Sequence, residues 1–201
     1  MNDCTVKQKT IANEISLKGV GLHTGVEVTM TFKPAPVNFG YAFKRVDLEG
    51  QPIVEADAAY VVNTQRGTNL DKRGVKIQTS EHVLAALVGM DIDNVLIELN
   101  ASEPPIMDGS SKYFVEALEK AGAIEQEADR DEYVVTEVVS YVDEATGSEI
   151  TVIPADEYQV TTMVDFGTKV LGTQNATLKH LSDFKDEIAN ARTFSFLHEL
   201  E

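Results

Sequence analysis

The stretch Thr79-Ser80-Glu81-His82-Val83-Leu84-Ala85-Ala86-Leu87 organises the chain. A polar pair stands directly before an apolar run whose leucines fall at helical spacing. This is the pattern of a helix N-terminus in which Thr79 or Ser80 is the N-cap. Gly89 then favours a helix end close to that residue. We therefore predict a helix over about residues 80–89, with Glu81 and His82 in its first turn.

The chemistry of this first turn suits hydrolysis at a metal. Unpaired N–H groups at a helix N-terminus give a partial positive charge, which favours an ionised Glu81 and a neutral His82. A carboxylate base and a neutral imidazole are the forms needed to activate a metal-bound water. A solvated glutamate beside a packing histidine is the ordinary alternative, and the dipeptide alone does not separate the two.

The composition is that of a globular protein with an acidic bias. The 201 residues suit one large domain or two small ones, and the chain is 43% hydrophobic and 25% charged. Its 17 basic and 33 acidic residues give a formal net charge of -16, which argues against nonspecific nucleic-acid binding. We expect no transmembrane segment, no signal peptide and, with Cys4 alone, no intrachain disulfide, so we predict a cytoplasmic protein.

The first half has the pattern of a sheet with two helices. Val26, Val28, Met30 and Phe32 alternate with polar residues, as in a half-buried strand. Before this strand, the three glycines of residues 19–25 indicate a tight turn that can require positive φ. The predicted elements are strands over 9–16, 26–33, 40–46, 75–78 and a central strand over 94–99, and helices over about 80–89 and 111–122, the second with Asp108 or Ser110 as its cap and Gly122 after its end.

The second half restarts the pattern after a charged segment. Glu125–Glu132 is the best candidate linker, and residues 133–143, 148–154 and 157–166 predict three strands before a helix over 181–190. Strands followed by a helix in both halves indicate a structural duplication, although no sequence repeat is visible. One short helix leaves a sheet face uncovered, so either a partner covers it or the second domain is incomplete. We predict an α+β fold with a first domain over 1–126 and the first part of a second over 131–201.

Four segments in order carry a family resemblance. They are residues 19–25 (Gly-Val-Gly-Leu-His-Thr-Gly), 79–82 (Thr-Ser-Glu-His), 106–110 (Ile-Met-Asp-Gly-Ser) and 191–194 (Ala-Arg-Thr-Phe). Each motif alone is weak, but the ordered set resembles the zinc-dependent UDP-3-O-acyl-N-acetylglucosamine deacetylases of lipid A biosynthesis in Gram-negative bacteria. The resemblance implies two similar domains, each a β-sheet with two helices, whose helices pack between the two outer sheets. It also implies cytoplasmic hydrolysis of the N-acetyl amide of UDP-3-O-(3-hydroxyacyl)-N-acetylglucosamine.

The same resemblance assigns catalytic roles. His82 matches the first ligand of the family's Zn²⁺, and Glu81 matches the general base that takes a proton from the zinc-bound water. Thr193 matches a threonine whose hydroxyl helps to hold the developing oxyanion. These roles agree with the chemistry, because zinc lowers the pKa of bound water to about 7 and a neighbouring carboxylate can take the proton.

Three further residues are implied to lie near the substrate. Phe194 is the neighbour of Thr193, and His23 matches a histidine near the metal. Asp108 matches a family acid close to the site, for which a helix cap is an equal alternative.

Other parts of the family's site have no counterpart in the sequence. The family's remaining zinc ligands are a His and an Asp four residues apart on a later helix, and its general acid is a further His. Neither His180 nor His198 substitutes for them. We expect the remaining ligands beyond residue 201, so that this chain alone is inactive and binds zinc weakly or not at all. In some bacteria this deacetylase is fused to a 3-hydroxyacyl-carrier-protein dehydratase.

Two other functions compete with this one. A zinc hydrolase of the His-x-x-Glu-His class fails, because Gln78 stands where the first histidine would be. A non-catalytic α+β binding module, or a degenerate copy of the enzyme, stays open. A His-x-x-x-Asp encoded downstream of codon 201 would favour the enzyme, and a native stop codon would favour the alternative.

Overall fold

The computed structural model describes residues 6–195, and its fold is of the predicted mixed α+β class. The elements are β1 (Lys7–Ile11), β2 (Ile15–Val20), β3 (Glu27–Pro34), β4 (Tyr41–Arg45), β5 (Ile53–Glu55), the 3₁₀ turn η1 (Ala58–Tyr60), β6 (Val61–Asn63), β7 (Asn69–Lys72), β8 (Val75–Ile77), α1 (Glu81–Gly89), β9 (Val95–Leu99), α2 (Lys112–Ala121), β10 (Ala123–Asp129), β11 (Val139–Asp143), β12 (Ser148–Val152), β13 (Val160–Asp165), β14 (Thr173–Leu178), the 3₁₀ turn η2 (Leu181–Asp183) and the π turn η3 (Phe184–Ile188).

A five-stranded sheet with the order β2-β3-β9-β4-β5 forms the body of the first half. Its middle strand β9 pairs antiparallel with β3 and parallel with β4. The predicted central position of this strand is therefore confirmed. Val95, Ile97 and Leu99 are buried on one face of β9, and Glu98 on the other face is paired with Lys33 and Lys44.

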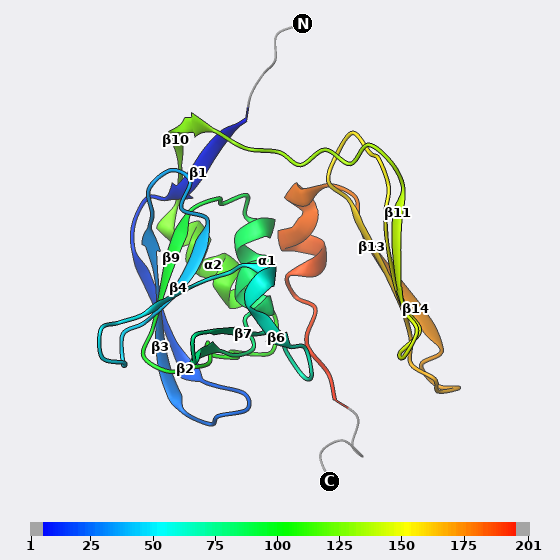
Figure 1. Ribbon diagram of the computed structural model, residues 1–201, viewed down its shortest axis with the longest axis horizontal. Helices are drawn as coiled ribbons and strands as arrows, with labels where there is room; N and C mark the ends of the chain where they lie inside the picture. The colour runs from blue at the N-terminus through cyan, green and yellow to red at the C-terminus, as the bar shows by residue number, and fades with distance from the viewer. Residues whose placement is uncertain (1–5, 196–201) are drawn as a thin grey trace, which may run out of the picture.

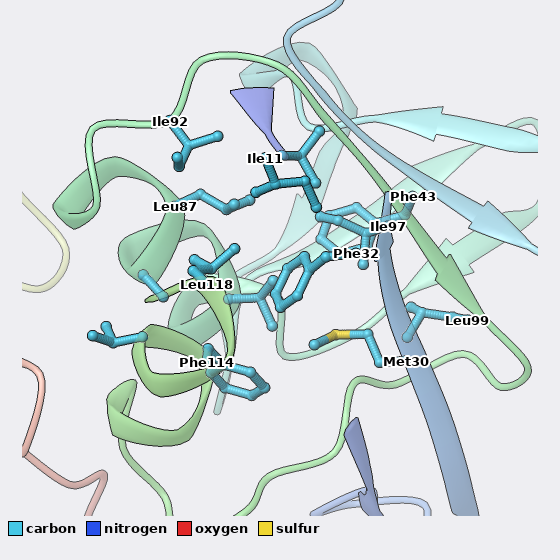
Figure 2. Packing of buried hydrophobic residues seen from close by; sticks show 14 of the residues in the cluster. Ile11, Met30, Phe32, Phe43, Leu87, Ile92, Ile97, Leu99, Phe114 and Leu118 are labelled. Carbon is cyan, nitrogen blue, oxygen red and sulfur yellow. The ribbon is translucent and has the colours of Figure 1, made fainter. Parts of the chain in front are cut away.

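Both helices contribute buried residues to the core beside this sheet, and α2 does so through one apolar face. In α2, Phe114, Val115 and Leu118 are buried, whereas Lys112, Glu119 and Lys120 are exposed, so the apolar residues form a stripe at helical spacing. Figure 2 shows Phe114 and Leu118 directed toward Phe32 of β3. Burial of each such side chain is worth about 1.5–3 kcal/mol, and this cluster is the main core of the molecule.

The second half forms two separate hairpins. β11 pairs with β12, and β13 pairs with β14, each as a two-stranded antiparallel sheet. Figure 1 shows the hairpins to one side of the helices, with η2 and η3 between them and α1. Large side chains on the hairpins are open to solvent: Tyr141 is 67% exposed, Ile150 66% and Met163 73%. The predicted strands therefore form, but they contribute little to the core.

Several predicted boundaries are wrong. The strand expected over 9–16 is broken at residues 12–14, because the Ala12 and Asn13 N–H groups turn to the carbonyls of Gly122 and Ala121 at the end of α2. The expected linker over 125–132 is mostly β10, which pairs with β1. β14 was not predicted, and the helix expected over 181–190 is a 3₁₀ turn followed by a π turn. The division into domains at residues 126 and 131 stays a prediction.

Candidate functional site

Helix α1 starts where the sequence predicted, but its hydroxyl side chains do not cap it. Ser80 is the N-cap residue, with helical φ of -81° and ψ of -15°. Its Oγ and its N–H both donate to the carbonyl of Thr68, at 3.0 and 3.1 Å. The Thr79 hydroxyl donates to the Glu103 carboxylate instead, at 2.9 Å. The predicted N-cap position is therefore confirmed for Ser80, but neither hydroxyl makes a capping hydrogen bond, because groups from other segments bind them.

The carboxylate of Glu81 is fixed by a loop that precedes β7. Glu81 is half-buried in the first turn of α1, and its Oε2 accepts the Thr68 N–H at 2.8 Å. Gly67 lies against the other oxygen, since a Cβ added there would be 3.4 Å from Oε1. The loop thus orients one carboxylate oxygen, and the absence of a side chain at Gly67 leaves space beside the second.

His82 follows on the same turn and links the two helices. It is half-buried, and its carbonyl accepts the Ser111 hydroxyl at 3.0 Å, one residue before α2 begins. Within residues 6–195, no three His, Cys, Asp or Glu side chains are grouped as a metal site would require. Because catalytic zinc takes three protein ligands, the described residues do not complete such a set.

His23 lies in the turn between β2 and β3, against the same loop that holds Glu81. Its Nε2 is 3.0 Å from the carbonyl of Arg66, and its N–H donates to the Glu103 carboxylate at 3.1 Å. Positive φ in this turn is confirmed for Gly25, at +64°. The other two glycines permit close approach: a Cβ at Gly19 would be 2.9 Å from Pro105, and one at Gly21 would be 2.6 Å from Glu103.

Glu103 is the site residue that sequence reasoning missed. It is fully buried, and its carboxylate accepts the N–H groups of His23 and Thr24 and the hydroxyls of Thr24 and Thr79, at 2.9–3.1 Å. Burial opposes ionisation, but these hydrogen bonds hold the pKa of the carboxyl below its ordinary value. The sequence offered one clue, an acid between the apolar β9 segment and Pro104-Pro105.

Asp108 is bonded within the protein on both oxygens. Oδ1 accepts the N–H and the hydroxyl of Ser110, at 3.2 and 2.6 Å, and Oδ2 accepts Arg192 at 3.0 Å. The Ser110 bond, against a smaller opposing effect of burial, and the Arg192 guanidinium hold the pKa of this carboxyl below its ordinary value. Ser110 Oγ in turn accepts the Lys112 N–H at 3.2 Å, so Asp108 orders the start of α2 through Ser110.

The segment with Thr193 and Phe194 runs beside the Asp108 loop. The Thr193 N–H donates to the carbonyl of Gly109 at 2.8 Å. The Phe194 ring meets Phe166 edge to face, with ring centroids 5.1 Å apart, and remains 62% exposed. Thr193 is thereby connected to α1 through Gly109, the following serines and the Ser111–His82 bond.

All four motif segments therefore meet at the N-terminal ends of the two helices. Glu103 joins the 19–25 turn to Thr79, Ser111 joins the 106–110 loop to His82, and Gly109 joins that loop to Thr193. Glu81 and His82 are the first two residues of α1, so a carboxylate and an imidazole that can act in acid–base chemistry lie where these segments meet. Among the described residues, no helix is long and apolar enough to cross a membrane.

Comparison with known proteins identifies the family of this chain. The model of the family named UDP-3-O-acyl N-acetylglycosamine deacetylase matches residues 8–201, so the chain belongs to this family of hydrolases, as its motifs predicted.

The chain is similar to particular members over nearly its whole length. It is 46% identical over 196 residues to the bifunctional enzyme LpxC/FabZ of Bacteroides thetaiotaomicron, covering 98% of this chain and 42% of that protein. It is 41% identical over 202 residues to the UDP-3-O-acyl-N-acetylglucosamine deacetylase of Myxococcus xanthus, covering 100% of this chain and 64% of that enzyme. The chain thus spans less than two thirds of the length of these relatives.

Proposed function

We propose that this chain is the part of a UDP-3-O-acyl-N-acetylglucosamine deacetylase that supplies the general base, Glu81, and one metal ligand, His82. The observation that carries the proposal is the placing of both residues in the first turn of α1, where the Thr68 N–H fixes the Glu81 carboxylate at 2.8 Å. Membership of the deacetylase family supports the reaction, and the substrate proposed is UDP-3-O-(3-hydroxyacyl)-N-acetylglucosamine.

The residues of this chain then have defined tasks. Glu81 takes a proton from the water that attacks the acetyl carbonyl. The Thr68 N–H holds Oε2 of Glu81 and so keeps the carboxylate from rotating. A positioned base of this kind contributes about 10²–10⁴-fold to the rate. Thr193, anchored through its N–H to Gly109, offers its hydroxyl to the developing oxyanion. Phe194 and His23 flank the substrate, and Asp108 holds Arg192 and so the Thr193 segment.

Zinc is the metal that the resemblance implies. Among the described residues, we assign only the His82 imidazole to the metal, and these residues do not form a complete zinc site. The tasks given above are therefore those of side chains in this chain and not of the metal. The proposal places the remaining ligands in the further length that the relatives have and this chain does not cover. The names of the bifunctional relatives favour a fused dehydratase. We further propose that the protein acts in the cytoplasm, in lipid A biosynthesis.

The test uses the complete gene product and measures release of acetate from the UDP-sugar substrate. We expect Glu81→Ala to keep its metal but to lose turnover by roughly 10²–10⁴-fold, and His82→Ala to lose metal as well. Glu49→Ala, at an exposed position in the β4–β5 turn, is the matched control and should leave both unchanged. Near-normal turnover in Glu81→Ala would refute the assignment of the base. A wild-type protein without activity would favour the degenerate copy.

A further inference from the structure

We propose that Glu103 is a positioning residue, which holds the general base Glu81 through a closed circuit of hydrogen bonds and backbone. This inference rests on the function proposed for Glu81. The circuit, termed the Glu103 ring, has two arms, one through Thr79 and one through His23, Arg66 and Thr68. Both arms start at the Glu103 carboxylate and end at Glu81.

The first arm is short and enters α1 from its N-terminal side. The Thr79 hydroxyl donates to Glu103 Oε1 at 2.9 Å, two residues before Glu81. Thr79 has a φ of +51°, an unfavourable conformation for a β-branched residue. Such a backbone persists only where surrounding contacts enforce it, and the buried bond to Glu103 is one of those contacts. The direction in which α1 starts thus depends on this hydroxyl.

The second arm fixes the carboxylate of Glu81 itself. Glu103 accepts the His23 N–H at 3.1 Å, and the His23 ring contacts the Arg66 carbonyl at 3.0 Å. Arg66 is two residues before Thr68, whose N–H donates to Glu81 at 2.8 Å. Arg66 has a φ of +58°, so each arm contains one residue in an unfavourable backbone conformation. Loss of either arm should therefore loosen the contact that orients the base.

The chemistry of the ring requires a carboxylate at position 103. Among residues 6–195, Glu103 is the one acidic side chain that is buried, and every hydrogen bond that it makes is one that it accepts. A carboxylate has acceptors on both oxygens, whereas an amide would turn a donor toward other donors. Position 103 is thus occupied by the group that can bind both arms at once.

The decisive variant is Thr79→Val in the complete gene product. It removes the hydroxyl of the first arm but keeps the β-branched shape. We expect kcat to fall roughly 10- to 100-fold, because a small misplacement of a catalytic group has effects of this size, while KM and metal content stay near those of the wild type. Thr79→Ser, which restores a hydroxyl, should recover most of kcat.

Thr10→Val is the matched control. The Thr10 hydroxyl is also buried, and it donates to the Asn94 carbonyl at 2.6 Å, away from the ring. This variant should lower stability but leave kcat of the folded enzyme unchanged. An equal loss of kcat in both variants, or an unchanged kcat in Thr79→Val, would overturn the proposal.

A second readout does not depend on activity. Hydrogen exchange of the Thr68 amide, the donor to Glu81, should become at least several-fold faster in Thr79→Val and not in Thr10→Val, compared with amides of β9. This result would support the Glu103 ring even if the enzyme assay refuted the proposed deacetylase function. Unchanged Thr68 exchange in Thr79→Val would refute the ring even in an active deacetylase.

Discussion

Among single residues, Glu103 combines full burial with a charge held only by dipoles in its described contacts. Removing a carboxylate from water is costly, and the amides of His23 and Thr24 together with two threonine hydroxyls offset that cost. The pKa of the carboxyl lies below its ordinary value of 4.5 as the net result. A group with a depressed pKa in the folded state stabilises that state when ionised.

The stability supplied by Glu103 should therefore depend on pH. It is fully present above about pH 4.5, the pKa in the unfolded chain, and is lost as pH falls through the lower pKa of the folded protein. We expect Glu103→Gln to be clearly less stable than the wild type near neutral pH, and the difference to shrink in acid. Urea unfolding at a series of pH values measures it. A difference that stays constant into acid would contradict the pKa depression.

Residues of the site differed in how far sequence could predict them. Glu81 and His82 were singled out because both lie at a helix start, which is a local property, and their roles were inferred from the family resemblance. Thr68 and Glu103 were missed because their roles arise from contacts between distant segments, such as the 80 residues between His23 and Glu103. The assignments of Glu81, His82, Thr193 and the substrate residues stay predictions until the variants are measured.

At the scale of elements, α1 and η3 meet at a glycine. Gly89 is the last residue of α1, and a Cβ added there would overlap the ring of Phe184 in η3. Glycine within a helix costs about 1 kcal/mol relative to alanine. Gly89 therefore makes α1 less stable, but it allows the Phe184 ring to pack closely against the helix. Phe184 and Ala189 are both buried, and Ala189 stands four residues before Thr193.

Gly89→Ala should consequently destabilise the protein although it favours α1. We expect a net loss of about 1–3 kcal/mol, typical of an overpacked contact, and faster hydrogen exchange at the Ala189 amide, which donates to the Phe184 carbonyl at 2.8 Å. Val88→Ala, at an exposed neighbouring position, should change either quantity little. A gain in stability from Gly89→Ala would show that η3 does not pack tightly on α1.

Elements with a clear apolar pattern of their own were predicted well, whereas β10 and β14, whose own sequences are largely polar, were not. The positions of α1 and α2 follow from apolar spacing, and that of β9 follows from a near-continuous apolar run with few charges. β10 has the sequence Ala-Ile-Glu-Gln-Glu-Ala-Asp, which has the composition of a linker, and it is a strand because β1 pairs with it. β14 has a polar, Thr-rich sequence and pairs with β13 in the same way.

For the whole molecule, the two halves differ in how much they bury. Helices α1 and α2 and strand β9 lie within one core, whereas β11, β12 and β13 expose almost every side chain. Local opening is easiest where few apolar contacts are lost.

We expect fast hydrogen exchange across residues 139–165 and slow exchange across 81–121 in the 201-residue chain. Mass spectrometry of peptic fragments resolves the two regions. Uniformly slow exchange in a monomer would mean that the second half is a stable domain by itself. The α+β class could be predicted from element types, but the order of strands could not, because it depends on which distant segments pair.

The pairing of β1 with β10 also has a consequence for biosynthesis. Lys7 lies opposite Asp129, so β1 is translated some 120 residues before the strand with which it pairs. At 5–20 residues per second, that interval is roughly 6–24 s. The separate five-stranded sheet cannot form completely before its middle strand, β9, has been translated. The nascent chain therefore carries unpaired strand edges throughout this interval, during which chaperones have access to them.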